Sequence, residues 1–276
     1  MSGVNLRYVA SSGRSYNLRS NTLRALSTTI FHKWKWDVKA VNLQYGARVT
    51  AFTRPAAVYE AALALFGLSE DNQALLDALH DDFELDVRNM TPGRLTWNDY
   101  YIECYAQEST TKPNNNIIAN NTVKFYCPYP FWIKEETKSF FGQSSGTTET
   151  FLDYPYDYDY DYFSGGSGSA TWQTDFPFKS DFRMVIYGPA VNPRIVINDQ
   201  VYQILDVLET SEHVVIDSKR GTIEKTTASG QKVNAFDLRN KAESVFEQIP
   251  AKTLSLSWPG TFGFDLTLYE ERSEPR

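Results

Sequence analysis

A serine between two glycines is the first pattern in this chain that could carry covalent chemistry. Gly142-Gln-Ser-Ser-Gly146 has the spacing of a nucleophile elbow, a turn between a strand and a helix that exposes the serine to a general base. A hydrolase would need a histidine to reach Ser144, and the chain offers three, His32, His80 and His213. Because serine, glycine and threonine surround the pattern and no helical sequence follows it, we predict no elbow and no enzymatic activity.

Two further groups of side chains have the types that bind metals. His80-Asp-Asp82 combines a histidine with two carboxylates, but no second histidine lies at ligand spacing, and histidine is common at helix ends. Cys104 and Cys127 form no Cys-x-x-Cys pair. Each lies in an alternating apolar run, so we predict a buried free thiol on each of two strands, with a disulfide as the alternative if those strands pair. We therefore predict no metal and no cofactor.

The segment Tyr154-Pro-Tyr-Asp-Tyr-Asp-Tyr-Asp-Tyr162 alternates aromatic and acidic side chains. In an extended chain the tyrosines project from one side and the aspartates from the other. Same-side carboxylates about 7 Å apart repel one another or chelate a hard cation such as calcium, whereas the tyrosines could stack on sugars or on a partner protein. A solvated surface loop is the third interpretation. The candidate partner-contact residues, from this repeat and from an earlier tryptophan pair, are Tyr156, Tyr158, Tyr160, Trp34 and Trp36.

Asn192-Pro-Arg194 matches part of the galectin sugar motif, His-x-Asn-Pro-Arg. The position of the motif's histidine holds Ala190, and no Trp-x-x-Glu-x-Arg follows Trp172 or Trp258. We therefore expect no galactoside binding by that motif, and Asn-Pro is instead typical of a turn that opens a strand. A carbohydrate-binding module for host recognition is kept as the alternative function.

Charge and composition favour a protein partner over a nucleic acid or a membrane. The 276 residues carry a net charge of −7, which opposes binding to DNA or to an anionic membrane. Arginines 7, 14, 19 and 24 are spaced too loosely for a basic patch and are interpreted as solvated or as subunit contacts. Aromatic residues make up 14% of the chain, which favours strands and interfaces. Without an apolar signal region or an apolar run of roughly 20 residues, we predict cytoplasmic synthesis and no membrane partner.

Strand-like alternation dominates the first 132 residues. Within residues 15–54, His32-Lys-Trp-Lys-Trp-Asp37 places its tryptophans on one face and its charged residues on the other. Gly46 is predicted as a β-bulge. Further strands are predicted over residues 83–87, 94–107 and 122–132, with a polar loop over 108–116.

A helical interruption divides these strands. Pro55 at the first helical position and Gly67 just past the end predict a helix over residues 55–66. Ser69 is predicted to cap a second helix that ends near His80. Residues 1–132 are therefore predicted to form a β-barrel or sandwich with a short helical insertion.

The rest of the chain changes character twice. Residues 133–180 have the composition of a linker that contains the Tyr-Asp repeat, although 131–141 could form a strand, so that the second domain would start near 133. Residues 181–276 contain short strands with turns at 198–199, 218–221, 229–230 and 259–260, which is typical of an all-β sandwich or jelly roll. One or two helical turns are predicted over 240–248. Leu254, Leu256 and Trp258 are predicted to share one face, as are Phe264, Leu266 and Leu268.

The order of several segments resembles the distal tail proteins of tailed bacteriophages, the hub component of the baseplate. The resemblance covers nearly the whole chain and is strongest after Asp181. It rests on the segments Tyr100–Cys104, Val123–Trp132, Tyr187–Asn198, Val215–Ile223, Asn234–Pro250, Trp258–Gly260 and Tyr269–Arg276.

This resemblance implies a mainly β fold with two domains. Residues 1–132 would be a belt domain related to tail-tube barrels, and the C-terminal domain, chiefly 181–276, a galectin-like jelly roll that often binds no sugar. It also implies a homohexameric ring in the virion that joins the tail tube protein to the tail-associated hub protein, with receptor-binding or other baseplate proteins as further neighbours. DNA would pass the lumen without specific binding. Six copies at −7 carry about −42 together, so we hypothesise that acidic residues dominate the lumen.

Overall fold

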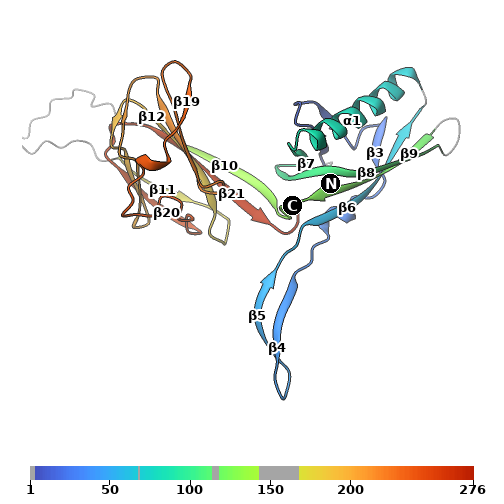
Figure 1. Cartoon of the computed structure of the whole chain (residues 1–276), viewed down its shortest axis with the longest axis horizontal. Coiled ribbons are helices and arrows are strands. Elements are labelled where there is room, and N and C mark those ends of the chain that lie inside the picture. The colour runs from blue at the N-terminus through green and yellow to red at the C-terminus, as the bar shows by residue number, and fades with distance from the viewer. Residues whose placement is uncertain (1–3, 68, 114–117, 143–167) are drawn as a thin grey trace, which may run out of the picture. The chain divides into compact units, whose positions relative to one another are not determined.

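The computed structural model describes residues 4–67, 69–113, 118–142 and 168–276 (Figure 1). Over these ranges the chain is mainly β, with several antiparallel sheets and one α-helix, so the predicted fold class is confirmed at that level. The chain divides into two compact units, Met1–Lys134 with Glu271–Arg276, and Glu135–Glu270, which we call the N-terminal and C-terminal units. Ser144 and the Tyr-Asp repeat with Tyr156, Tyr158 and Tyr160 lie outside the described residues.

Two antiparallel sheets that share one long strand form the N-terminal unit. The shared strand is β8 (Tyr100–Pro113), whose first half pairs with β7 and whose second half pairs with β9 after a register shift between Ala106 and Glu108. One sheet continues from β8 to β7 (Gly93–Trp97), β1 (Leu6–Val9) and β2 (Ser15–Asn17), with the first residues of β10 (Trp132–Phe140) on the other side. The second sheet continues from β8 to β9 (Ile118–Cys127), β6 (Ala57–Phe66) and β3 (Leu23–Ala25).

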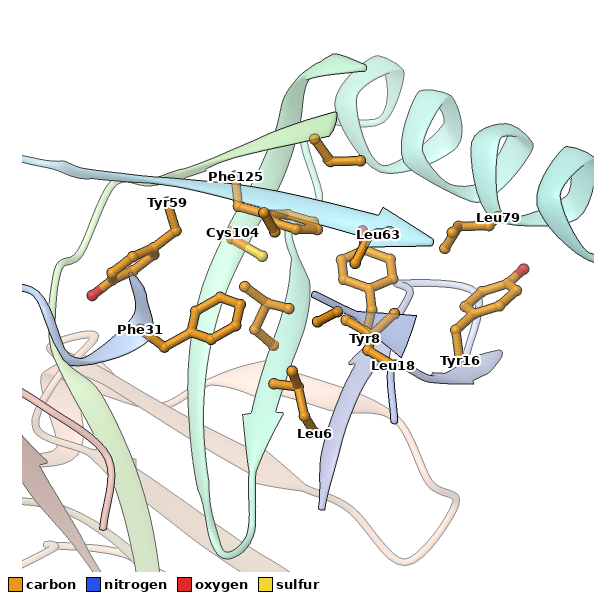
Figure 2. Packing of buried hydrophobic residues seen from close by; sticks show 14 of the residues in the cluster. Leu6, Tyr8, Tyr16, Leu18, Phe31, Tyr59, Leu63, Leu79, Cys104 and Phe125 are labelled. Atoms are coloured by element: carbon orange, nitrogen blue, oxygen red, sulfur yellow. The ribbon is translucent and has the colours of Figure 1, made fainter. Parts of the chain in front are cut away.

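Large aromatic and aliphatic side chains fill the space between these sheets (Figure 2). Tyr8 packs edge-on against Phe83, with ring centroids 4.8 Å apart, and Phe31 packs against Tyr59 at 5.6 Å. Cys104 and Cys127 are buried, free thiols on β8 and β9, as predicted. This core buries one face of each sheet, which is the main source of stability for such a fold.

The helix predicted over residues 55–66 is wrong, because residues 57–66 of this segment form strand β6. Its buried side chains recur at every second position, Tyr59, Ala61, Leu63 and Leu65, each at most 3% exposed. The strand pairs with β9 on one side and with β3 on the other. Pairing with two neighbouring strands therefore outweighed the helix propensity of this segment, because propensity is a weaker influence than tertiary contacts.

The helix α1 (Glu70–Arg88) is longer than predicted and includes the predicted strand over residues 83–87, which is wrong. Its start is confirmed, because the Ser69 hydroxyl accepts a hydrogen bond from the Asn72 amide. The helix continues because its buried residues follow helical spacing, at Leu76, Leu79, Asp82, Phe83 and Asp86.

Several strand boundaries in this unit also differ from the prediction. A 3₁₀ turn, η1 (Thr29–His32), and an irregular segment over 33–36 replace the strand predicted over 32–37, and β4 begins only at Asp37. Gly46 lies in a turn with φ +80°, whereas the bulge falls between Lys39 and Ala40. Residues 94–107 belong to two strands, β7 and β8, and the predicted loop over 108–116 begins as the continuation of β8. The strand predicted over 122–132 is β9, which begins earlier and ends at Cys127.

The C-terminal unit also consists of antiparallel sheets around its own core. One sheet orders β19 (Lys232–Asn234), β18 (Thr222–Thr226), β17 (His213–Asp217), β12 (Asp181–Tyr187), β21 (Phe264–Arg272) and β10. Another orders β11 (Gly168–Gln173), β20 (Thr253–Trp258), β14 (Arg194–Ile197) and β15 (Gln200–Gln203). The strands β13 (Ala190–Val191) and β16 (Val207–Leu208) pair separately. The predicted inward faces are confirmed, since Leu254, Leu256, Trp258, Phe264, Leu266 and Leu268 are all buried.

Turn chemistry was predictable in this unit, whereas one helical prediction was wrong. The turn between β14 and β15 uses Asn198 and Asp199, both at positive φ, as expected for a two-residue hairpin. Residues 240–248 form turns and bends, and the short 3₁₀ helix, η2, lies earlier at Phe236–Leu238. The segment is fixed by buried Val245 and by the bond from the Asn240 amide to the Gln203 carbonyl.

Candidate protein–protein interface

Among the described residues of the N-terminal unit, a two-stranded ribbon between η1 and β6 is exposed along nearly its whole length. It consists of β4 (Asp37–Asn42) and β5 (Ala47–Thr53), and we call residues 37–53 the arm. Figure 1 shows the arm projecting away from the other strands of its unit. Every residue from 38 to 53 is exposed. Two-stranded ribbons are marginally stable in water by themselves, so this arm is a candidate for coverage by another protein surface.

The register of the arm separates its side chains into two faces. Val38 lies opposite Phe52, and Ala40 lies opposite Val49, so these four apolar side chains share one face. The other face carries Lys39 opposite Ala51 and Val41 opposite Arg48. Phe52 is 60% exposed, which is unusual for a large aromatic side chain that serves only the fold of its own chain.

Aromatic and aliphatic side chains also occupy the tip of the arm. Tyr45 is 87% exposed and Leu43 is 57% exposed. The turn is closed by a hydrogen bond from the Leu43 amide to the Gly46 carbonyl at 3.0 Å. Tyrosine at an exposed tip is typical of interface residues that fill a pocket on a partner.

An arginine fixes the base of the arm to the C-terminal end of the chain. The Arg54 guanidinium lies 4.5 Å from the ring centroid of Phe131 and 5.7 Å from that of Trp36. It also donates hydrogen bonds to the Ser273 hydroxyl at 2.7 Å and to the Ser273 carbonyl at 3.2 Å. Burial lowers the pKa of Arg54 from its ordinary value. These contacts hold the first and last residues of the arm near a fixed point.

The tryptophans proposed as partner contacts lie at this base and not on a strand. Trp34 is 54% exposed and lines a groove of about 670 Å³ that also includes Lys33, Arg54 and Val58. Trp36 is 37% exposed and packs against Phe131, with centroids 6.0 Å apart. Their role in binding a partner stays a prediction. The exposed side chains of the arm were missed, although the alternating run over 37–53 was visible in the sequence.

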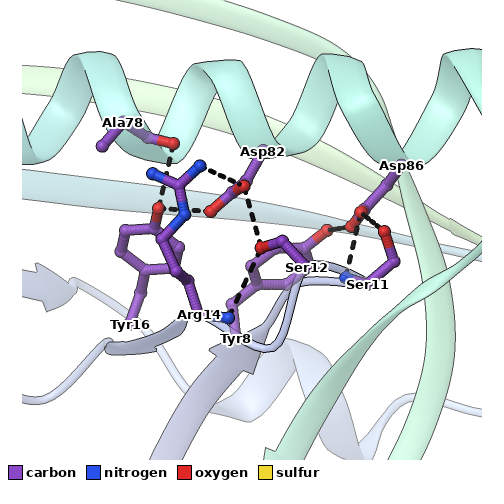
Figure 3. Close-up of polar contacts among 8 residues, drawn as sticks. All are labelled: Tyr8, Ser11, Ser12, Arg14, Tyr16, Ala78, Asp82 and Asp86. Atoms are coloured by element: carbon purple, nitrogen blue, oxygen red, sulfur yellow. Dashed lines mark hydrogen bonds and ion pairs between the residues drawn. The ribbon is translucent and has the colours of Figure 1, made fainter.

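A second polar site joins α1 to the turn between β1 and β2 (Figure 3). The Asp86 carboxylate, fully buried, accepts hydrogen bonds from the Tyr8 hydroxyl and from the Ser11 amide and hydroxyl. Burial, together with the bond to Asp86, raises the pKa of Tyr8 far above its ordinary range, so Tyr8 remains a neutral donor.

Asp82, one turn earlier on the same helix face, is also fully buried. It accepts hydrogen bonds from the hydroxyls of Tyr16 at 2.5 Å and Ser12 at 3.0 Å, and it pairs with the Arg14 guanidinium at 3.0 Å. Burial and the bond to Asp82 raise the pKa of Tyr16. The Asp82 carboxylate therefore fastens the first hairpin to α1, and Arg14, interpreted from sequence as solvated or as a subunit contact, binds within its own unit.

His80 was expected at a helix end and instead lies in the interior of α1. Its Nε2 lies 2.5 Å from the Asn121 amide nitrogen and 3.3 Å from the Ser109 hydroxyl. Burial lowers the pKa of His80, an effect opposed by the carboxylates of Asp77 and Asp81. In the part of the chain that the structure describes, no group of three or more His, Cys, Asp or Glu side chains could hold a metal ion.

No helix among the described residues combines the length and apolarity needed to cross a membrane.

No protein-family model matches the sequence, and no curated protein shows significant similarity to it. Solved structures do match. The SPP1 Dit protein (gp 19.1), described as a paradigm of the hub adsorption apparatus in phages infecting Gram-positive bacteria, is 12% identical with a TM-score of 0.60, over 98% of this chain and 100% of that chain. A chain of the phage P2 baseplate in its activated conformation with Ca is 12% identical with a TM-score of 0.65, over 99% and 100%. The same baseplate with Sr gives 12% and 0.64, again over 99% and 100%. The resemblance to distal tail and baseplate hub proteins is confirmed at the level of the fold.

Proposed function

We propose that this protein is a structural component of a phage tail, a distal tail protein that forms a ring of six at the baseplate hub. The observation that carries this proposal is the arm, a ribbon exposed over all of residues 38–53. The likeness in fold to the SPP1 Dit protein over nearly the full length supports it. In this proposal the N-terminal unit is the belt domain, related to tail-tube barrels, and the C-terminal unit is the galectin-like jelly roll.

The arm suits an assembly that closes on itself. An arm and the surface that receives it are different patches, so each copy would contact one neighbour with its arm and another with its receiving surface. Such a head-to-tail contact produces a ring when the rotation between copies closes. The ring would have the tail tube protein on one side and the tail-associated hub protein on the other, with other baseplate proteins around it.

Charge and side-chain chemistry support a structural role in the virion. A net charge of −7 per copy opposes adhesion to DNA that passes through a lumen. The three histidines have structural neighbours: His32 packs on the Trp97 ring at 4.9 Å, His80 contacts Asn121, and His213 lies 6.1 Å from the Tyr187 ring. We propose that the protein acts by assembly and not by catalysis.

The test is the assembly state of the full-length protein by native mass spectrometry and negative-stain electron microscopy. We expect six-fold rings from the natural sequence. In an arm-shortened variant, a short Gly-Ser turn replaces residues 38–52 and joins Asp37 to Thr53, which lie opposite each other. This variant is expected to be a folded monomer. A natural chain that stays monomeric at high concentration would refute the ring, and rings from the arm-shortened chain would refute the role of the arm.

A further inference from the structure

We propose that the arm of one copy docks along α1 of the next copy, with Tyr45 entering the groove between α1 and β8. This inference rests on the proposed ring and names the surface that receives the arm. Figure 1 shows the arm and α1 on different sides of the strands of the N-terminal unit. An arm therefore does not reach the helix of its own chain, and in this proposal a second copy supplies the contact.

Opposite charges on the two elements provide the first support. Residues 33–53, the arm with its base, carry four basic side chains and one acidic one in a chain whose net charge is −7. The helix α1 carries seven acidic side chains and one basic one. Two of the seven, Asp82 and Asp86, are buried and bonded within the unit. The other five are exposed, and one of them, Glu84, also pairs with Arg88 at 2.8 Å on the same helix. The exposed acidic side chains are Glu70, Asp71, Asp77, Asp81 and Glu84.

The geometry of the acidic side chains matches the basic face of the arm. Asp77, Asp81 and Glu84 are spaced by four and three residues, so they form one stripe along the exposed side of α1. Lys39 and Arg48 share one face of the arm. When complementary charges face each other in this way, they fix the register of a contact and exclude wrong partners.

The C-terminal end of α1 offers a site for the tip of the arm. A groove of about 400 Å³ is lined by Val87, Met90, Tyr105, Ala106, Gln107 and Tyr126. Its apolar side chains are exposed, Met90 by 77% and Val87 by 41%. Tyr45, exposed by 87%, has the size and amphipathic character of a residue that anchors an interface in such a groove.

The lengths of the two elements agree with this placement. The 19 residues of α1 span about 28 Å, at about 1.5 Å per residue. From Tyr45 back to Lys39 is about 20 Å of strand, and from Met90 back to Asp77 is also about 20 Å of helix. With Tyr45 at Met90, Arg48 then falls near Asp81 and Glu84, and Lys39 falls near Asp77. The apolar face of the arm points away from α1 and stays available to a different protein of the tail.

A charge swap in the full-length protein tests this contact. The arm variant is Lys39→Glu with Arg48→Glu, and the helix variant is Asp77→Lys with Asp81→Lys. Each is expected to weaken ring formation by tenfold or more, whereas the chain that carries all four changes is expected to recover most of that loss. All four side chains are exposed, so circular dichroism and the unfolding midpoint, both measured at a dilution where the natural ring has dissociated, should stay unchanged.

Cysteine pairs provide an independent readout. A chain with Tyr45→Cys and Met90→Cys is expected to form disulfide-linked ladders between copies on mild oxidation. The control chains carry Tyr45→Cys alone or Met90→Cys alone, which lack the second thiol and should give no ladder. If rings form from the natural chain but neither charge recovery nor a ladder is seen, the arm docks elsewhere and the ring proposal survives. If the natural chain forms no ring, both proposals fall.

Discussion

In the N-terminal unit, Asp82 and Asp86 are fully buried on α1, whereas every residue from 38 to 53 of the arm is exposed. Burial of a carboxylate is unfavourable unless it is hydrogen-bonded. Each of these two carboxylates accepts hydrogen bonds from residues of the first hairpin. The arm shows the opposite arrangement, with large apolar side chains such as Phe52 in water. The buried site satisfies its polar groups within one chain, whereas the arm leaves apolar surface that no described element of its own unit covers.

The two sites affect different properties: the buried carboxylates stabilise the subunit, and the arm stabilises its assembly with other subunits. A change at the buried carboxylates should destabilise the subunit, because it leaves hydroxyl and amide donors without acceptors in a buried place. A change on the arm should leave the subunit folded and weaken its association with neighbours.

Replacement of Asp86 by alanine should have the largest effect on folding. It removes the acceptor for the Tyr8 hydroxyl and for two donors of Ser11, so we expect a loss of about 3–5 kcal/mol in the free energy of unfolding. The measurement is urea unfolding in the arm-shortened chain, where ring formation does not contribute. Asp81→Ala is the matched control, an exposed carboxylate on the same helix, with an expected change within about 0.5 kcal/mol. Equal losses in the two variants would contradict the assigned role of Asp86.

Replacement of Tyr45 by alanine should affect assembly and not folding. We expect the dissociation constant of the ring to rise about 30-fold, as for an aromatic side chain that fills a groove on a partner. Mass photometry over a dilution series measures this change, and the unfolding midpoint checks the subunit. The control is Phe178→Ala, which removes an aromatic side chain that is 62% exposed in the C-terminal unit. A similar weakening in the control would remove the special role of the arm.

The contacts of Arg54 predict a smaller effect on both properties. Loss of the cation–π contacts with Phe131 and Trp36 should cost about 1 kcal/mol. In Arg54→Ala, hydrogen exchange should become faster in residues 37–42 and 271–276, because the hydrogen bonds to Ser273 are also lost. Arg54→Lys should rescue little, since an ammonium group cannot reproduce the planar stacking and paired donation. Full rescue by lysine would mean that only the positive charge matters.

The buried site and the arm also differ in how far the sequence predicted them. The sequence alone predicted the structure correctly where turn residues or the alternation of apolar residues determine it, as at Asn198 and Asp199 or along β20 and β21. It was insufficient for β6, whose alanine-rich sequence favours a helix until β3 and β9 pair with its edges. The mistaken strand over 83–87 separated Asp82 from Asp86, so their shared helix face was not recognised.

For the arm, the alternating pattern was seen, but its exposure was not predicted. Alternation indicates which side chains share a face, but it cannot tell whether another element of the same chain covers that face. Trp34 and Trp36 were chosen because tryptophan is enriched at interfaces, and they lie beside the arm. Exposure of Tyr45 and Phe52 depends on the absence of a covering element among the described residues, which only the fold shows.

The smallest expected effect is a pH dependence of the free energy of unfolding, which comes from the partly buried His80. Burial lowers the pKa of His80 below its ordinary value of 6.5, although Asp77 and Asp81 oppose the shift. The folded state therefore binds fewer protons than the unfolded state, so the stabilising effect is present above pH 6.5 and is lost as the pH falls through the lowered pKa. Urea unfolding of the arm-shortened chain at neutral and at mildly acidic pH should show this loss.

Since other groups also titrate in this pH range, the deciding quantity is the difference in pH dependence between the natural residue and His80→Gln. That variant retains an amide near Asn121 and should lose less stability on acidification, and an identical pH dependence in both chains would show that His80 does not contribute.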